Sequence, residues 1–386
     1  MSEIRGRLLL AATSDESLLF LDGFPQFLVE QGWDVHVVAS PGPRLDAFSD
    51  VPGVTTHALA MRRNPSPVHD LRSLVAWWRL LGSVRPDALL VGTPKASLLA
   101  LIASRLRRVP VRVYHVLGLR LESSQGVART ILRTMEQVTA ACATHVLSVS
   151  ASLADALTRE GVVARRRIDV LGAGSSNGVD TERFSPVAIA PFRDAARASL
   201  GAGPDCLVAG FVGRLNADKG LDTLVAALDL LRDLENLRLV VVGAVDEANA
   251  AGTESLSRDP RVHLVGYSDD TREWYAGMDV VLLPTLREGL PNVVLEASAC
   301  GIAVVVSNAT GAIDAVVDGV TGLVFPVGNA SALAEAITAL HDDGALRAEL
   351  GRRGRHHVVS NFERREVWAA HDRYLASAVP EMRTQR

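Results

Sequence analysis

The stretch that decides the fold is residues 207–231, LVAGFVGRLNADKGLDTLVAALDLL. It begins with a short apolar run, which is typical of a strand covered on both faces. A loop containing two glycines follows, and then a helical pattern whose single apolar face is formed by Leu221, Leu224, Val225, Leu228 and Leu231. A buried strand followed by an amphipathic helix is half of a parallel β-α-β unit, so the stretch predicts a doubly wound α/β fold.

The same alternation extends along the whole chain. In the first half the predicted strands are 7–12, 34–39, 88–91, 111–116 and 145–149; in the second half they are 207–212, 239–242, 262–265, 280–283, 303–306 and 323–325. Helical patterns separate them, and one of these predicts a single apolar face from Leu71, Leu74, Val75, Trp78 and Leu81. The pattern indicates two facing Rossmann-like domains, each a parallel sheet covered by helices, with an interdomain cleft at the carboxyl ends of the strands.

Length and turn-forming residues place the domain boundary. A chain of 386 residues is long enough for two α/β domains. The segment 172–180, GAGSSNGVD, is rich in turn formers and is the expected hinge. We therefore predict domains at 1–178 and 179–361. A C-terminal helix over 362–386, carrying Phe362, Trp368 and Tyr374, is expected to pack back on the first domain.

Composition excludes several classes of protein. A net charge of −4 argues against bulk binding of nucleic acid. Cys142, Cys206 and Cys300 lack metal-binding spacing and lie in apolar contexts, so we expect buried thiols in a reducing compartment. The sequence shows no convincing secretory signal and no apolar run of bilayer-spanning length. The expected location is cytoplasmic, or at most on the inner face of the cell membrane.

The loop after the 207–212 strand suits an anion. Gly213 permits a tight turn beside a ligand, while Arg214 and Lys219 flank the start of the next helix. Free N–H groups and the helix dipole at such a start favour negative charge. Two cations there suit a diphosphate, because arginine can bind two oxygens at once. The alternative is that both are solvated surface cations.

A second loop, 288–296 with sequence EGLPNVVLE, follows the 280–283 strand. Pro291 suits the first position of a helix that should stop near Gly301, so Asn292 and Val293 would present unpaired N–H groups to a phosphate. Glu288 could accept bonds from sugar hydroxyls, and Glu296 could hold a ribose diol. The structural alternatives are that Glu288 only complements the helix dipole and that Glu296 is a solvated helix residue.

These two loops carry a family resemblance. Glu288 and Glu296, separated by seven residues, resemble the E-x7-E signature of retaining glycosyltransferases. Together with GRLNADKG at 213–220, they are similar to glycosyltransferase family four, whose members have the GT-B fold. The likeness covers nearly the whole chain and includes NGVD at 177–180 and VVDGVTGL at 316–323.

The resemblance implies roles for the matching residues. It makes Arg214, Lys219 and Glu288 catalytic: the two cations neutralise the leaving diphosphate, and the carboxylate holds the transferred sugar. The donor is further bound by Gly213, Tyr267, Gly289, Leu290, Pro291, Asn292, Val293 and Glu296. Tyr267 would lie near the base, although a core or rim aromatic is nearly as good an interpretation. The resemblance also implies retention of anomeric configuration without a side-chain nucleophile.

No metal or cofactor is expected. The sequence has no convincing D-x-D motif, and we interpret Asp269 and Asp270 as a turn or a helix cap. An arginine–lysine pair with helix N-termini can stabilise a leaving diphosphate in place of a metal. The nucleotide diphosphate sugar, with UDP as the default, is then a co-substrate.

The first half offers acceptor or cleft candidates with weaker signals: Thr13, Ser14, Lys95, His115, Gly118 and Glu122. Thr13 and Ser14 follow the first strand, where many family members have a glycine pair. Lys95 opens a helix. Members of the family often place a histidine directly before the glycine that matches Gly118; here that residue is Leu117, and His115 lies two residues earlier. His115 either substitutes for it or is a buried, hydrogen-bonded core histidine.

The first half most resembles the branch that builds capsular and other surface polysaccharides on polyprenyl diphosphate lipids. Its arginines suggest a basic face for anionic lipid heads or, equally, scattered solvated cations: Arg62, Arg63, Arg105, Arg107, Arg108, Arg112, Arg120, Arg129 and Arg133. The run 165–167 is more simply an exposed loop. The predicted partners are a nucleotide sugar, a glycan or lipid-linked acceptor and a membrane surface. The alternatives are transfer to a soluble small molecule, a nucleotide-sugar 2-epimerase and a non-catalytic binding subunit.

Overall fold

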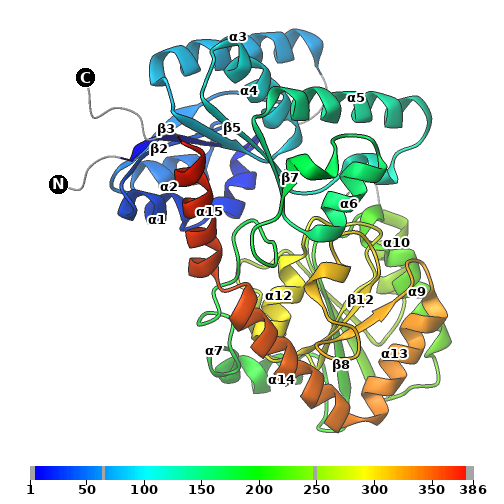
Figure 1. Ribbon diagram of the computed structural model, residues 1–386. Coiled ribbons are helices and arrows are strands. Elements are labelled where there is room, and N and C mark those ends of the chain that lie inside the picture. Colours follow the sequence, from blue (N-terminus) through cyan, green and yellow to red (C-terminus); the bar gives the residue numbers. More distant parts are fainter. Residues whose placement is uncertain (1–4, 63–65, 247–249, 380–386) are drawn as a thin grey trace. The chain divides into compact units, whose positions relative to one another are not determined.

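The computed structural model describes residues 5–62, 66–246 and 250–379. The chain divides into two compact units (Figure 1). Unit 1 consists of residues 1–177 with 365–386, and unit 2 consists of residues 178–364. Each contains one parallel sheet, as the alternating strand and helix patterns predict.

The sheet of unit 1 has the strand order β3-β2-β1-β4-β5-β6-β7, and all its pairs are parallel. Its strands are β1 (Gly6–Ala11), β2 (Trp33–Ala39), β3 (Val54–Ala58), β4 (Ala88–Val91), β5 (Val111–Val116), β6 (His145–Ser148) and β7 (Ile168–Asp169). The five predicted strands are confirmed. The two missed strands, β3 and β7, form the edges of the sheet, where a strand is short or half-exposed and lacks a continuous apolar run.

Helices cover both faces of this sheet. They are α1 (Phe24–Glu30), α2 (Pro43–Ser49), α3 (Pro67–Val84), α4 (Pro94–Leu106), α5 (Gly126–Cys142), α6 (Ala151–Arg159) and α15 (Arg364–Ala378). Short 3-10 turns occupy Asp15–Leu21, Arg120–Ser123 and Arg165–Arg167. Side chains from α1 and α15 pack against β1 and β2 in one core. Helices α3, α4 and α5 lie side by side as a separate layer (Figure 1).

The apolar face predicted for α3 is wrong. Of its five residues only Leu81 is buried, while Leu71, Val75 and Trp78 are exposed and Leu74 is intermediate. The buried face is instead formed by Ser73, Trp77, Leu81 and Val84. A serine is tolerated there because its hydroxyl donates to the Ala60 and His69 carbonyls, at 2.9 Å each. Periodicity found an apolar stripe but could not tell which side of the helix meets the protein.

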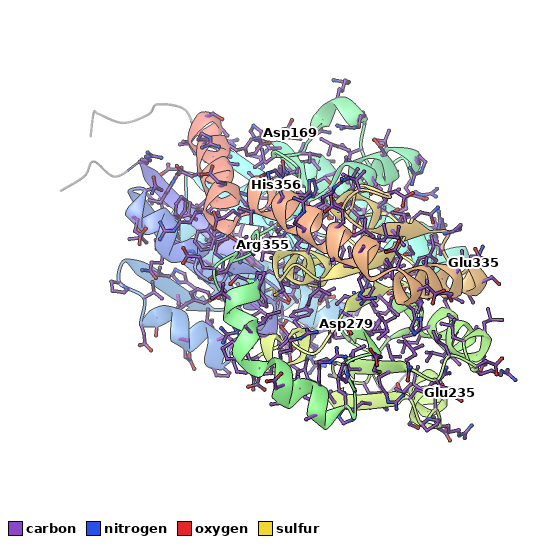
Figure 2. The ribbon with its side chains drawn as sticks, turned by 90° about the horizontal axis from the view of Figure 1, so that it is seen from below. Asp169, Glu235, Asp279, Glu335, Arg355 and His356 are labelled. Carbon is purple, nitrogen blue, oxygen red and sulfur yellow. The ribbon has the colours of Figure 1, made fainter. Side chains whose placement is uncertain are left out.

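Helix α15 belongs largely to unit 1 and is tied to it by aromatic and polar contacts. Trp368 packs 5.6 Å from Phe27, between ring centres, and its indole N–H donates to Asn177 Oδ1 at 2.6 Å. Tyr374 donates to Asp169, labelled in Figure 2, at 2.7 Å. The helix begins at Arg364, so Phe362 is not part of it, contrary to the prediction; this buried residue lies between α14 and α15.

Unit 2 has a six-stranded parallel sheet in the order β10-β9-β8-β11-β12-β13. The strands are β8 (Leu207–Val212), β9 (Leu237–Val242), β10 (Val262–Gly266), β11 (Val280–Leu283), β12 (Ala303–Ser307) and β13 (Leu323–Phe325), which confirms all six predicted strands. The helices are α7 (Pro186–Ile189), α8 (Arg193–Ser199), α9 (Leu221–Leu230), α10 (Ala250–Ser257), α11 (Arg272–Tyr275), α12 (Asn292–Ala299), α13 (Ala330–Asp342) and α14 (Gly344–Asn361). Short 3-10 turns occupy Ala190–Phe192, Ala217–Lys219 and Ile313–Ala315.

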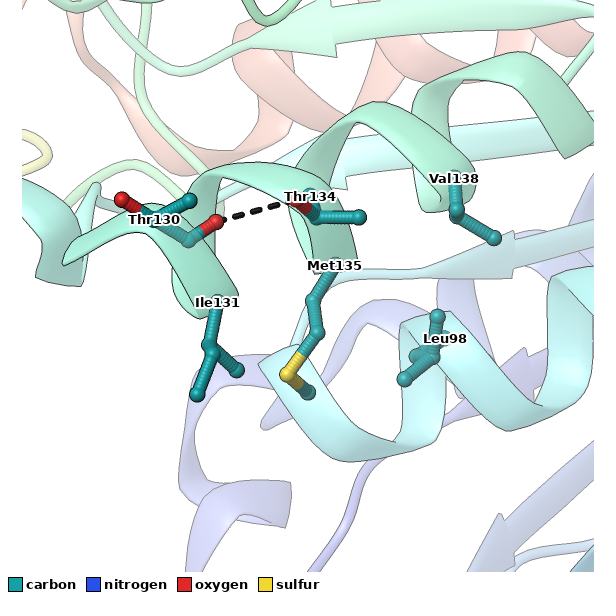
Figure 3. A pocket seen from close by; sticks show the side chains of 6 residues that line it. All are labelled: Leu98, Thr130, Ile131, Thr134, Met135 and Val138. Atoms are coloured by element: carbon teal, nitrogen blue, oxygen red, sulfur yellow. Dashed lines mark hydrogen bonds between the residues drawn. The ribbon is translucent and has the colours of Figure 1, made fainter. Parts of the chain in front are cut away.

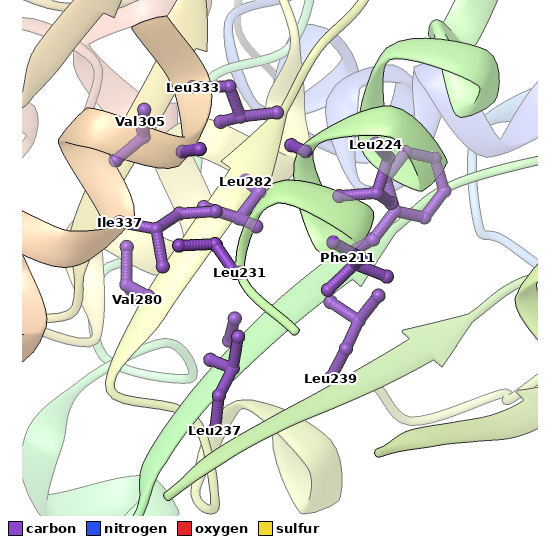
Figure 4. Packing of buried hydrophobic residues seen from close by; sticks show 14 of the residues in the cluster. Phe211, Leu224, Leu231, Leu237, Leu239, Val280, Leu282, Val305, Leu333 and Ile337 are labelled. Atoms are coloured by element: carbon purple, nitrogen blue, oxygen red, sulfur yellow. The ribbon is translucent and has the colours of Figure 1, made fainter. Parts of the chain in front are cut away.

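The core of unit 2 confirms the apolar face of the helix that opened the sequence argument. Leu224 of α9 packs with Phe211 and Leu239 of the sheet (Figure 4). Helix α13 adds Leu333 and Ile337 to the same cluster. The predicted burial of all three cysteines is also confirmed. Over the described residues, no helix combines the length and apolar character needed to cross a bilayer.

Candidate functional site

In unit 2, the loop after β8 is held against the end of β11. Gly220 has φ +69°, and a Cβ atom built on it would lie 1.9 Å from the Pro284 carbonyl oxygen. Only glycine fits there, because both the backbone conformation and the space exclude a side chain. This close approach brings the GRLNADKG loop next to the EGLPNVVLE segment, two motifs about 70 residues apart in the sequence.

Asp218 is the residue that joins the two loops. Its carbonyl oxygen accepts the Leu286 N–H at 2.7 Å and the Thr285 hydroxyl at 2.9 Å. Its carboxylate pairs with Arg287, with 2.5 Å between the nearest nitrogen and oxygen. These contacts set the position of the neighbouring Lys219 and Glu288. Sequence reasoning did not single out Asp218, Thr285 or Arg287, whose roles depend on contacts across the two loops.

The structure brings Lys219 and Glu288 together. Lys219 Nζ lies 2.5 Å from Glu288 Oε1, and the two side chains are only 18% and 14% exposed. The Glu288 N–H donates to the Thr310 carbonyl at 2.8 Å, which fixes the loop that carries the carboxylate. Arg214, at the other end of the same turn, is exposed. The pair therefore presents one cation and one anion that are shielded from water, beside a second, exposed cation.

The segment after Glu288 leads into the start of α12. A Cβ atom on Gly311 would lie 2.3 Å from the Gly289 carbonyl oxygen, so that glycine allows the loop to approach. Pro291 caps the helix from outside, and Asn292 is the first helical residue, one position later than predicted. The helix stops at Ala299, and Gly301 follows with φ +77°, as expected for a glycine past the end of a helix. Leu290, Asn292 and Val293 are partly exposed around the helix start, where N–H groups lack partners from a preceding turn.

Glu296 is not a fully solvated helix residue. Its Oε2 accepts the Tyr275 hydroxyl at 3.1 Å, and the same hydroxyl lies 3.3 Å from the Val293 carbonyl oxygen. Burial raises the pKa of Glu296 to about 7, although the Tyr275 hydrogen bond and the charges of Arg183 and Arg364 act in the opposite direction. Near neutral pH this carboxyl can therefore accept or share a proton. Tyr275 was missed because its position in the sequence, on the short helix α11, gives no functional signal.

The remaining donor-side candidates lie nearby in the sequence but have different surroundings. Tyr267, directly after β10, is 64% exposed, so it is a rim residue and not part of the core. Asp270 accepts the Arg272 N–H at 3.2 Å, and hydrogen bonding by the Arg272 side chain lowers its pKa to about 2. This agrees with a turn preceding α11. Among the described residues, no three His, Cys, Asp or Glu side chains gather in a group that could hold a metal ion.

In unit 1, Thr13 serves the start of α4. Its hydroxyl accepts the Ala96 N–H at 3.0 Å and lies 2.8 Å from the Thr93 hydroxyl, which accepts the Thr13 N–H at 2.7 Å. The side chain is buried. Ser14 is partly exposed, and its hydroxyl lies 2.8 Å from that of Ser17. The Thr13 side chain thus has a structural task, joining the end of β1 to the next helix.

Lys95 and Glu122 stand apart from Thr13. Lys95 Nζ lies 2.8 Å from Asp70 Oδ1, an ion pair that ties α4 to α3. Glu122 is half-buried in the 3-10 turn after β5, and Gly118 precedes that turn with φ +152°. None of these three lines the small cavity at the carboxyl ends of β1, β4 and β5.

His115 does line that cavity, which has a volume of about 30 Å³. Its ring centre lies 5.3 Å from that of His371 on α15, and no described group bonds its Nε2 atom. Burial, reinforced by the charge of His371, lowers the pKa of His115 well below its ordinary value. The histidine is therefore neutral near pH 7. Ser176 and Phe20 also line the cavity; both lie outside any sequence motif.

Two family descriptions match the chain. Residues 207–343 match "Glycosyl transferases group 1", and residues 26–174 match "Glycosyl transferase 4-like domain". The two matches fall on unit 2 and unit 1, respectively.

Individual relatives and solved structures agree with these matches. The capsular polysaccharide biosynthesis glycosyltransferase CapM of Staphylococcus aureus is 33% identical over 360 residues, covering 92% of this chain and 93% of CapM. The Escherichia coli UDP-Gal:alpha-D-GlcNAc-diphosphoundecaprenol alpha-1,3-galactosyltransferase is 25% identical over 87% of each chain. Anabaena HepE, solved with UDP and glucose, superposes with a TM-score of 0.79 at 20% identity, covering 96% of this chain and all of HepE; that likeness concerns the fold.

Proposed function

The chain belongs to the group 1 glycosyltransferases of family four, with a GT-B fold, and on this premise we propose a retaining, metal-independent transfer of a hexose or N-acetylhexosamine. It is a glycosyltransferase that uses a nucleotide sugar. The proposed donor is a UDP-sugar, and the proposed acceptor is a hydroxyl of a polyprenyl diphosphate-linked glycan in surface polysaccharide synthesis. No cofactor takes part.

The observation that carries the proposal is the Lys219–Glu288 ion pair, shielded from water beside the start of α12. A donor diphosphate entering beside Lys219 would compete with Glu288 for that cation. The released carboxylate could then accept hydrogen bonds from hydroxyls of the transferred sugar. The pair thus holds both groups in place before the donor arrives, so little reorganisation is needed on binding.

In the proposed reaction the bond between the sugar C1 and the diphosphate oxygen breaks, and a bond from C1 to the acceptor oxygen forms on the same face. The acceptor proton passes to an oxygen of the departing diphosphate. Lys219, Arg214 and the first N–H groups of α12 stabilise the negative charge on that diphosphate as it develops. Glu296 holds the ribose hydroxyls, with Tyr275 orienting its carboxyl.

The proposed acceptor follows from the relatives. CapM takes part in capsular polysaccharide biosynthesis, and the Escherichia coli relative is named for a diphosphoundecaprenol-linked sugar. A polyprenyl diphosphate resides in a membrane, so the proposal includes action at the inner face of the cell membrane. Acceptor contacts are proposed for the unit 1 candidates at the ends of β1 and β5, with His115 at the cavity between them.

Two measurements test this function. A thermal-shift screen against nucleotide sugars should show stabilisation by the true donor, because a ligand that binds only the native state raises its apparent stability. Transfer of radiolabelled sugar to a polyprenyl diphosphate glycan should then exceed transfer to soluble acceptors. The proposed acceptor is wrong if a water-soluble small molecule is the better substrate. The proposed chemistry is wrong if the product has inverted configuration.

A further inference from the structure

We propose that the outer face of the α3–α4–α5 layer of unit 1 docks on a bilayer surface that contains anionic lipid. This deepens the proposed function by assigning the surface that would bring the enzyme to a membrane-bound acceptor. The inference itself depends on the exposed side chains of three helices and on their charge.

Helix α3 presents an apolar stripe to solvent. Val68, Leu71, Val75 and Trp78 recur at helical spacing along 16 Å or so of the helix, and each is at least 40% exposed. The opposite side of the helix, with Trp77 and Leu81, faces the protein. A helix that is apolar on both sides needs a second apolar partner.

The stripe is flanked by arginines on the same helix. Arg72 and Arg79 are exposed and stand four positions after Val68 and Val75, respectively, so they lie along one edge of the stripe. At the end of the helix, the Arg107 guanidinium stacks 3.4 Å above the Trp78 ring. An arginine beside an apolar surface can bury its stem while its head reaches a phosphate.

Helices α4 and α5 continue this surface. Leu106, at the end of α4, is 66% exposed, and Val127 and Ile131 of α5 are 77% and 54% exposed. Between the two helices lies an apolar groove of about 390 Å³ (Figure 3), in which Ile131 and Met135 point toward the helix that carries Leu98. The groove gives a place for apolar lipid chains at the same outer face.

Charge decides the kind of partner. Residues 66–142 contain eleven lysines and arginines against four acids, in a chain with 40 basic and 44 acidic residues overall. Two of those acids already have partners: Asp70 pairs with Lys95, and the buried Glu136 accepts the Tyr114 hydroxyl. An apolar stripe with an arginine border matches a layer of anionic head groups above acyl chains.

The predicted arginine face is thereby corrected in its membership. Arg129 and Arg133 pair with Glu160 on the inner side of α5, and Arg112 bonds the Cys142 and Val109 carbonyls. Arg63 lies outside the described residues. The cations available to a membrane are chiefly Arg72, Arg79, Arg105 and Arg108, all exposed. Sequence alone could not separate these two sets.

The test is co-flotation of the full chain with vesicles of phosphatidylcholine, alone or with phosphatidylglycerol. We expect binding to the anionic vesicles that weakens as salt rises. Replacing both Arg72→Gln and Arg79→Gln should lower the partition coefficient about 25-fold, at about fivefold per arginine. The variant Leu71→Ser/Val75→Ser should lower it about tenfold or more. Matched controls are Arg166→Gln/Arg232→Gln, at exposed arginines elsewhere, and Val187→Ser/Leu230→Ser, at exposed apolar residues of unit 2.

A second readout reports the depth of insertion. Trp78 is the one tryptophan that is 45% exposed among the large exposed residues, so brominated lipid should quench its fluorescence, and Trp78→Phe should abolish that quenching. Equal partition to both vesicle types, or wild-type partition by both patch variants, would overturn the proposal. So would a stable dimer that buries this face and leaves vesicles unbound. Transfer to a soluble acceptor analogue should stay at the wild-type rate in the patch variants, which separates failure of docking from failure of the proposed reaction.

Discussion

Replacing Lys219 by methionine tests the proposed site most directly. The side chain is mostly shielded from water, so its charge acts on a bound diphosphate through a medium of intermediate dielectric constant. A unit charge about 4 Å from a phosphate oxygen is worth about 4 kcal/mol under such conditions, and loss of one preorganised stabilising group typically costs about 10²–10³ in kcat. We therefore expect Lys219→Met to lower kcat by roughly that factor at saturating donor.

The same variant should also lose stability, because Glu288 is left without its 2.5 Å partner. Breaking a fully buried pair costs about 3–5 kcal/mol. Since both side chains are slightly exposed, we expect about 2 kcal/mol in urea unfolding. The double variant Lys219→Met/Glu288→Gln should recover much of this stability while transfer remains lost. That combination would separate catalysis from folding.

The matched control is another shielded ion pair of unit 2. Arg197 lies 2.8 Å from Asp279 (labelled in Figure 2), with side chains 12% and 13% exposed. Arg197→Met should cost at least as much stability, since Arg197 also bonds the Cys206 carbonyl, yet it should leave kcat nearly unchanged. Turnover by Lys219→Met within a few-fold of wild type would refute the assigned role. Equal loss of kcat in both variants would show that the effect is only structural.

Other perturbations should have equally specific outcomes. Gly220→Ala should cost about 2 kcal/mol or more and abolish transfer, because its Cβ would meet the Pro284 carbonyl; Gly201→Ala, with similar φ but open space, should cost only about 1 kcal/mol, and urea unfolding with an activity assay distinguishes them. Glu296 holds its proton up to about pH 7 when folded but only to about 4.5 when unfolded, so it should lower stability by at most about 3 kcal/mol as pH rises between those values; Glu296→Gln should flatten that part of the urea-unfolding profile. Tyr275→Phe removes a hydrogen bond that lowers the pKa of Glu296, so the loss of donor affinity on acidification should begin at a higher pH, as isothermal titration with the nucleotide can show. A chelator should leave the transfer rate nearly unchanged; complete loss restored by magnesium or manganese would contradict the metal-free mechanism.

Strand and loop patterns were readable because they depend on local chemistry. The runs at 207–212 and 280–283 are apolar throughout, since strands inside a parallel sheet are buried on both faces. The edge strand Val54–Ala58, with threonines and a histidine, lacks that signal and was missed. On the site, the motifs located Lys219 and Glu288, but nothing in their spacing gives the 2.5 Å contact between them.

The sequence by itself determined the two Rossmann-like units, the family and the segments that carry the candidate donor site, because buried strands and short motifs leave a local record in residue order. Tertiary structure alone decided which side of α3 is covered: Trp77 is buried, while Leu71 and Trp78 face solvent. It also decided that Asp218 joins the two motif loops and that Tyr275 reaches Glu296. Such outcomes depend on contacts between segments distant in the chain, and the energy of those contacts is set by packing that no single segment encodes.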